Sequence, residues 1–133
     1  MIYLDTSALL KSIFVETHSD ALQAYVREHD AEGFVSSVLL SIETRRAVQR
    51  IDPHSLPQAD LELSRVGQVA LADAVVEAAG RFPDPRLRSR DAIHLATALL
   101  LREELTALVS YDTQMLAAAE SQRLPAVSPG DAG

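Results

Sequence analysis

The sequence of 133 residues lacks cysteine and tryptophan, and only 5% of its residues are aromatic. Without cysteine, the chain forms no disulfide, thiolate-ligated zinc site or iron–sulfur cluster, and it has no thiol nucleophile. The scarcity of aromatic side chains disfavours a protein that stacks nucleic-acid bases on aromatic platforms. Apolar runs stay short of the roughly 18 residues that a membrane helix needs. Because position 5 is acidic, where a signal peptide would carry basic residues, we expect a cytoplasmic protein without membrane association.

Basic residues are also few, with 12 against 19 acidic ones and a formal net charge of −7. This balance argues against a broad basic surface that coats nucleic acid, but not against a nuclease whose acids gather around a cation. All basic residues except Lys11 are arginine, and seven of the arginines form two clusters in the sequence. Arginine clusters are typical of local phosphate contacts or of a solvated charged face. The two clusters are Arg81, Arg86, Arg88 and Arg90, and Arg45, Arg46 and Arg50.

Short apolar runs alternate with stretches of helical periodicity. This alternation predicts one α/β domain over residues 1–133, with a central, mostly parallel sheet covered on both faces and frayed residues from about 128 to 133. Strands are predicted at 1–4, 34–37, 69–71 and 107–109, with a short strand or tail from 125. Helices are predicted at 8–14, 19–28, 38–51, 61–66, 73–79, 91–104 and 112–121, with loops at 53–57 and 82–87.

Two acids follow predicted strands. Asp5 comes after the first strand and Asp112 after the strand at 107–109. In open α/β sheets, ligands bind beyond the carboxyl ends of the strands, so these two side chains can face one crevice. Each can equally be an N-cap of the helix that follows, although Asp112 lacks the capping box because position 115 is methionine.

Two further acids lie beside apolar helix faces. Glu43 has apolar residues at three of its four i±3 and i±4 positions, where an unpaired carboxylate is costly. It can instead form a surface pair with Arg46. Asp91 begins the longest apolar-rich helix, where it can also complement the helix dipole.

Carboxylates that converge without bases between them repel one another unless a cation neutralises them. Oxygen ligands in a chain without cysteine select a hard cation, so the expected cofactor is Mg²⁺, with Mn²⁺ as an alternative. Such ions can activate water and neutralise the charge that develops when a phosphodiester is hydrolysed. The candidate catalytic and metal-binding residues are Asp5, Glu43, Asp91 and Asp112.

Four segments resemble, in order and spacing, the four motifs of PIN-domain nucleases, particularly the VapC-like toxins of bacterial toxin–antitoxin systems. Residues 2–10 (IYLDTSALL) contain Asp5, and residues 36–46 (SSVLLSIETRR) contain Glu43. Residues 89–98 (SRDAIHLATA) contain Asp91, and residues 109–116 (VSYDTQML) contain Asp112.

The resemblance implies a three-layer α/β/α fold and a metal-dependent endoribonuclease that cleaves RNA and is held inactive by a cognate antitoxin. It also implies a homodimer. Asp5 and Asp91 would ligate Mg²⁺ directly, while Glu43 and Asp112 would complete the shell directly or through water. Family members often have a hydroxyl near the site, as Ser7 and Ser110 would provide.

Several other residues carry less specific expectations. We favour a structural role for His94, although its position three residues after Asp91 allows it to reach the pocket. The arginines from Arg81 to Arg90 are the first candidates for RNA phosphate contacts, followed by Arg45 and Arg46. Apolar residues of the early helices are candidates for antitoxin contact or for ordinary core packing: Leu10, Ile13, Phe14, Leu22 and Tyr25.

Three alternatives compete with this prediction, and the third fits the sequence poorly. One is a catalytically inactive PIN-fold binding module, and another is a DNA-directed nuclease of the same fold. The third is a phosphoryl-transfer domain with Asp5 as nucleophile. A haloacid-dehalogenase-like enzyme would carry a second aspartate at position 7, which is Ser7, and a receiver domain would need a late lysine, whereas the single lysine is Lys11.

Overall fold

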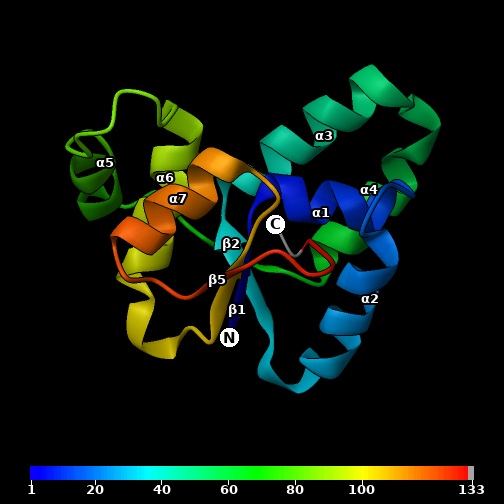
Figure 1. The fold of residues 1–133 in the computed structure, drawn as a ribbon. Helices are drawn as coiled ribbons and strands as arrows, with labels where there is room; N and C mark the ends of the chain where they lie inside the picture. The colour runs from blue at the N-terminus through cyan, green and yellow to red at the C-terminus, as the bar shows by residue number, and fades with distance from the viewer. Residues whose placement is uncertain (132–133) are drawn as a thin grey trace.

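Five short parallel strands form the centre of the molecule in a computed structural model that describes residues 1–131 (Figure 1). They lie in the order β3-β2-β1-β4-β5, and β1 pairs with both β2 and β4. The strands are β1 (Ile2–Leu4), β2 (Phe34–Ser37), β3 (Gly67–Val69), β4 (Ala107–Val109) and β5 (Ala126–Val127).

Helices cover both faces of this sheet. In Figure 1, α1 to α4 lie on one side of the strands, and α5 to α7 lie on the other. The predicted three-layer α/β/α fold with a parallel central sheet is therefore confirmed. The helices are α1 (Thr6–Ile13), α2 (Ser19–Glu28), α3 (Leu39–Ile51), α4 (Leu56–Ser64), α5 (Asp73–Ala79), α6 (Ser89–Leu100) and α7 (Thr113–Ser121), with 3₁₀ turns at Asp30–Glu32, Pro53–Ser55 and Arg102–Glu104.

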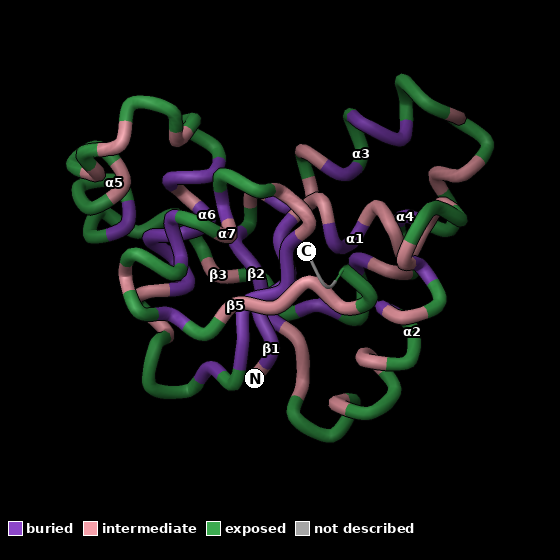
Figure 2. The backbone as a smooth tube through the Cα atoms, viewed as in Figure 1, coloured by how far each residue is buried: buried purple, intermediate pink, exposed green. Residues whose placement is uncertain are grey.

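The alternation of side chains along β1 divides the core between the two faces of the sheet. Ile2 and Leu4 pack with residues of α1 to α4, whereas Tyr3 packs with residues of α6 and α7 such as Leu95 and Met115. All five side chains are buried, and Figure 2 shows β1 as a buried strand at the centre of the molecule. Tyr3 therefore points toward α6, where its hydroxyl lies 2.8 Å from Nδ1 of His94.

The strand order places a switch point at the central strand. From β1 the chain first builds outward through β2 and β3, and it then returns to the other side of β1 with β4 and β5. Parallel sheets of this kind leave a crevice at the carboxyl ends of the strands on either side of such a point. Asp5 directly follows β1, and Asp112 lies three residues after the end of β4, so both lie at this edge.

Some predicted boundaries are wrong. Helix α4 begins at Leu56 rather than at 61, because Pro57 lies in its first turn, where a missing N–H costs nothing. Strand β3 spans Gly67–Val69 rather than 69–71, since its pairing runs from Val35 opposite Gly67. Helix α6 ends at Leu100, and residues 102–104 form a separate 3₁₀ turn.

The segment expected to fray makes defined contacts up to its last described residue. Ser128 Oγ donates to the Ser110 carbonyl at 2.9 Å, and Tyr111 Oη donates to the Pro129 carbonyl at 2.8 Å. Residues 132 and 133 lie outside the described residues. Within residues 1–131, no helix has the length and apolarity required to span a membrane.

We expect Leu95→Ala to lower the free energy of unfolding by about 2–5 kcal/mol, because Leu95 is 1% exposed and its removal leaves a cavity in the core. The control is Leu100→Ala on the same helix, where the leucine is 54% exposed and the change should stay within about 0.5 kcal/mol. Urea denaturation of both variants measures the difference, and equal effects would contradict this description of the core.

Candidate functional site

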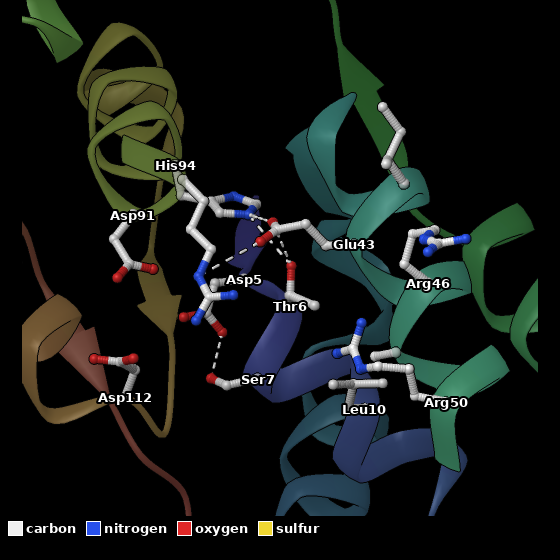
Figure 3. Close-up of a pocket in the computed structure, with 13 residues that line it drawn as sticks. Asp5, Thr6, Ser7, Leu10, Glu43, Arg46, Arg50, Asp91, His94 and Asp112 are labelled. Carbon is white, nitrogen blue, oxygen red and sulfur yellow. Dashed lines mark hydrogen bonds and ion pairs between the residues drawn. The ribbon is translucent and has the colours of Figure 1, made fainter. Parts of the chain in front are cut away.

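A pocket of about 620 Å³ opens beside the carboxyl ends of the central strands, and all four predicted acids line it (Figure 3). They come from separate elements: the β1–α1 junction, helix α3, helix α6 and the β4–α7 loop. In Figure 3, Asp91 and Asp112 lie on one side and Glu43 on the other, with Asp5 between them. The remaining lining residues are Thr6, Ser7, Leu10, Ile42, Arg46, Ala47, Arg50, Arg90 and His94.

Asp5 is buried, with 3% of its surface exposed, and three groups hydrogen-bond to its carboxylate. Oδ1 accepts from the Ala8 N–H at 3.0 Å, which caps α1, and from Ser7 Oγ at 2.6 Å. Oδ2 accepts from Ser110 Oγ. Burial raises the pKa of Asp5, and the bonds from Ser110 and Ser7 oppose that rise. Both predicted hydroxyls therefore lie at the site.

Asp112 is the N-cap of α7, and it also lines the pocket. Its Oδ1 accepts from the backbone N–H of Gln114 at 2.8 Å and of Met115 at 3.0 Å. The capping and pocket interpretations are thus compatible. Because the cap uses Oδ1, the second oxygen remains available for another partner.

Asp91 carries a strongly perturbed carboxylate. Its pKa rises from 3.8 to about 6, first because it is buried and then because the charge of Asp112 and, more weakly, that of Asp5 repel its ionised form. The charge of Arg90 offsets part of this rise. Among residues 1–131, no hydrogen-bond donor contacts the Asp91 carboxylate, which differs in this respect from those of Asp5 and Asp112.

Glu43 is held differently from the aspartates. Its Oε1 accepts from Thr6 Oγ1 and from His94 Nε2, each at 2.8 Å, and its Oε2 lies 3.9 Å from Arg90 Nε. Burial alone would raise the pKa of Glu43, but the bonds from His94 and Thr6 and the nearby positive charge outweigh burial and lower it. Glu43 therefore ionises more readily than an ordinary glutamate.

The donor set fits a hydrated divalent cation. The four acids offer only oxygen ligands, which hard cations prefer, and the mutual repulsion felt by Asp91 would be relieved by a positive ion. In the described part of the chain, no three His, Asp or Glu side chains are arranged to ligate one ion directly. Mg²⁺ keeps several of its waters and uses one or two carboxylates, so it does not need such a cage.

The arginines divide between the pocket and the outer surface. Arg46, Arg50 and Arg90 line the pocket. Arg88 and Arg86 line a second hollow of about 420 Å³, which shares Arg90, Asp91 and Asp112 with the first. Two other arginines that were candidates for phosphate contacts line neither hollow. Arg45 pairs with Asp60 at 3.0 Å, and Arg81 pairs with Glu77.

Thr6 was not expected in the pocket, and Arg50 was expected only as a member of an arginine cluster. The signal for Arg50 was present, because positions 43, 46 and 50 fall on one face of a helix. Among the candidate antitoxin contacts, Leu22 is fully buried in the core and Leu10 lines the pocket. Leu22 therefore packs as a core residue.

Comparison with known proteins identifies the family. The PIN domain family matches residues 2–121. Ribonuclease VapC35 of Mycobacterium tuberculosis is 40% identical to this chain over 134 aligned positions, which cover 99% of both proteins. The chain belongs to the VapC family of PIN-domain ribonucleases. The family expected from the four motifs is confirmed, and ribonucleases with this domain generally depend on a divalent metal ion.

Solved structures similar to this VapC-family chain share its fold. Mycobacterium tuberculosis VapC20, described as a toxin that cleaves the sarcin–ricin loop, matches with a TM-score of 0.71 and 16% identity, over 89% of this chain and 95% of its own. A chain of a toxin–antitoxin complex from Klebsiella pneumoniae matches with a TM-score of 0.71 and 21% identity, over 97% of this chain and 98% of its own. Both likenesses support the three-layer architecture.

We expect Asp91→Asn to stabilise the protein in EDTA at pH 7 but not at pH 4. The folded-state pKa of about 6 exceeds the ordinary 3.8, so ionisation of Asp91 begins to destabilise the fold above pH 4, with the full effect above pH 6. The gain from the variant should approach about 3 kcal/mol at pH 7, at about 1.4 kcal/mol per pKa unit.

Chemical denaturation at both pH values measures this gain. Asp20→Asn, an exposed change on α2, is the control and should show no such trend. A stability difference between Asp91→Asn and the unaltered protein that is the same at pH 4 and pH 7 would contradict the repulsion described here.

Proposed function

We propose that this VapC-family protein is a Mg²⁺-dependent endoribonuclease, with Mn²⁺ able to replace Mg²⁺, and that it hydrolyses RNA phosphodiester bonds in the pocket of Asp5, Glu43, Asp91 and Asp112. The observation that carries the proposal is the convergence of four carboxylates from four separate elements on one pocket. The raised pKa of Asp91 supports it, because the neighbouring charges that raise it also favour a bound cation.

The acids and serines of the pocket have separate proposed roles. Asp5 and Asp91 would hold the ion, and Asp112 and Glu43 would complete its surroundings directly or through water. A divalent ion held there supplies Lewis-acid polarisation of the phosphate and neutralisation of developing charge. Ser7 and Ser110 keep the Asp5 carboxylate oriented through hydrogen bonds to its two oxygens.

Arginines at the pocket would bind the phosphates on either side of the cleaved bond. Arg46 and Arg50 project from α3 at one end of the pocket in Figure 3. Arg90 lines both hollows, and Arg86 and Arg88 line the second one. Guanidinium groups suit this task because their donors match phosphate oxygens in pairs.

The proposed biological setting follows that of related proteins. We infer that residues 1–133 act as one domain, as a cytoplasmic homodimeric toxin that a cognate antitoxin neutralises. The similarity of this chain to a protein of a toxin–antitoxin complex supports the antitoxin partner. RNA is the proposed substrate because the relative that is 40% identical is named a ribonuclease.

Purified protein should cut total cellular RNA into discrete fragments in Mg²⁺ and should not do so in EDTA. Asp91→Asn should lower the cleavage rate by at least about 100-fold, the scale on which loss of one charge-stabilising group reduces turnover. The control variant Asp20→Asn makes the same chemical change on the exposed surface of α2, and it should cleave RNA at the rate of the unaltered protein.

Each outcome of this assay distinguishes a different function. Cleavage that persists in EDTA or in Asp91→Asn would contradict the proposed site. Cleavage of DNA in place of RNA would identify a DNA-directed nuclease. A folded, antitoxin-free protein that cuts neither substrate in Mg²⁺ or Mn²⁺ would be an inactive binding module.

Arg50→Ala should weaken RNA binding and reduce the slope of log affinity against log salt concentration by about 0.7, the contribution of one phosphate contact to a single strand. Arg45→Ala is the matched control, because Arg45 lies on the same helix but pairs with Asp60 outside the pocket. Fluorescence anisotropy in the Asp91→Asn background measures binding without cleavage. A salt slope for Arg50→Ala that equals the slope of the unaltered protein would show that Arg50 does not contact the phosphates.

A further inference from the structure

His94 is a buried histidine at the wall of the pocket, and the hydrolysis proposed above assigns it no step. Its side chain is 2% exposed. One ring nitrogen, Nε2, lies 2.8 Å from Glu43 Oε1, and the other, Nδ1, lies 2.8 Å from Tyr3 Oη. The tyrosine and imidazole rings meet edge to face with their centroids 5.8 Å apart. His94 thus joins the central strand to an acid of the pocket.

The partners of His94 assign its tautomer. An ionised carboxylate only accepts hydrogen bonds, so Nε2 must carry the hydrogen that faces Glu43. Tyr3 Oη already accepts from the Ser37 N–H at 3.1 Å, which leaves its own proton to donate to Nδ1. Burial raises the pKa of Tyr3, so the phenol keeps this proton. These partners assign a hydrogen to Nε2, which donates to Glu43, and leave Nδ1 to accept from Tyr3.

This chain of hydrogen bonds determines which oxygen of Glu43 is available. Oε1 accepts from both His94 and Thr6, and these two bonds use its two lone pairs. Oε2 receives neither bond and lies 3.9 Å from Arg90 Nε. Glu43 therefore presents a single oxygen to the pocket, whereas an unrestrained glutamate could offer either oxygen or both.

The placement of these groups follows from two short sequence spacings. Thr6 adjoins Asp5 in the chain, and His94 lies one helical turn after Asp91. Each pair therefore supplies one carboxylate to the pocket and one hydrogen-bond donor to Glu43. The pleat of β1 directs Tyr3 toward α6, where its hydroxyl meets the imidazole.

We propose that Tyr3 and His94 are positioning residues for Glu43: they hold Oε1 through the Nε2 hydrogen so that Oε2 alone faces the metal or its water. The inference rests on the proposed function, because it assigns a task within the same site. Groups that orient ligands in this way typically change metal affinity or activity by about 10- to 100-fold when they are replaced.

Two amide substitutions at position 94 separate positioning from packing. In His94→Gln the amide nitrogen falls near the place of Nε2 and can still donate to Glu43. In His94→Asn it falls near Nδ1, which faces Tyr3, so the donor to Glu43 is lost. We expect His94→Asn to lower kcat and Mn²⁺ affinity by about 10- to 100-fold, and His94→Gln to stay within about threefold of the unaltered protein.

The measurements keep this inference separate from the proposed ribonuclease activity. Calorimetric titration with Mn²⁺ in the absence of RNA reports on the metal site even if no RNA is cleaved, and steady-state kinetics resolves kcat from KM. In a Glu43→Gln background, His94→Asn should have no further effect on Mn²⁺ affinity, because the residue acts through Glu43. Thermal unfolding of each variant reports its stability.

Equal losses of Mn²⁺ affinity in His94→Gln and His94→Asn, in proportion to a lower melting temperature, would show a purely structural role and overturn the inference. Affinity retained by both variants would overturn it too. A test on the unaltered protein does not depend on variant folding. Long-range ¹⁵N–¹H correlation should show His94 with its hydrogen on Nε2 and Nδ1 as an acceptor, whereas a hydrogen on Nδ1 alone would rule out donation to Glu43.

Discussion

The buried carboxylate of Asp5 connects the central strand to the elements on both sides of it. Through Oδ1 it caps α1, and through Oδ2 it accepts from Ser110 just beyond β4. Ser7, which also donates to Asp5, accepts a hydrogen bond from the Tyr111 N–H at 2.9 Å. A charge removed from water needs such partners. The same bonds therefore hold the strand ends together and place the first carboxylate of the pocket.

The other three acids around Asp5 differ in how many hydrogen bonds their carboxylates accept. Asp112 is engaged by the N-terminus of α7 and Glu43 by two side-chain donors, whereas Asp91 meets the repulsion of its neighbours. Bringing these like charges together lowers the stability of the fold. Such locally unfavourable arrangements are typical of sites that bind a ligand. The arrangement is consistent with a VapC-family chain whose cation completes the charge balance of the pocket.

Much of the fold and part of the site could be predicted from the sequence. The alternation of strands and helices indicated the parallel sheet, and acids that follow strands could be placed at one edge. The contact between Tyr3 and His94 could not, because a tyrosine in a strand is usually a core residue, and its partner depends on how α6 packs across the sheet. By contrast, the place of Arg50 in the pocket could have been predicted, because position 50 shares a helix face with Glu43 and position 45 does not.

The most direct test of the account is the titration of the Asp91 carboxyl carbon by NMR, in EDTA and in saturating Mg²⁺. We expect an apparent pKa of about 6 without metal, because burial and the charges of Asp112 and Asp5 disfavour ionisation. We expect saturating Mg²⁺ to lower this pKa, since a bound cation favours the ionised form. An ordinary pKa that Mg²⁺ does not change would contradict both the repulsion in the pocket and its role as a metal site.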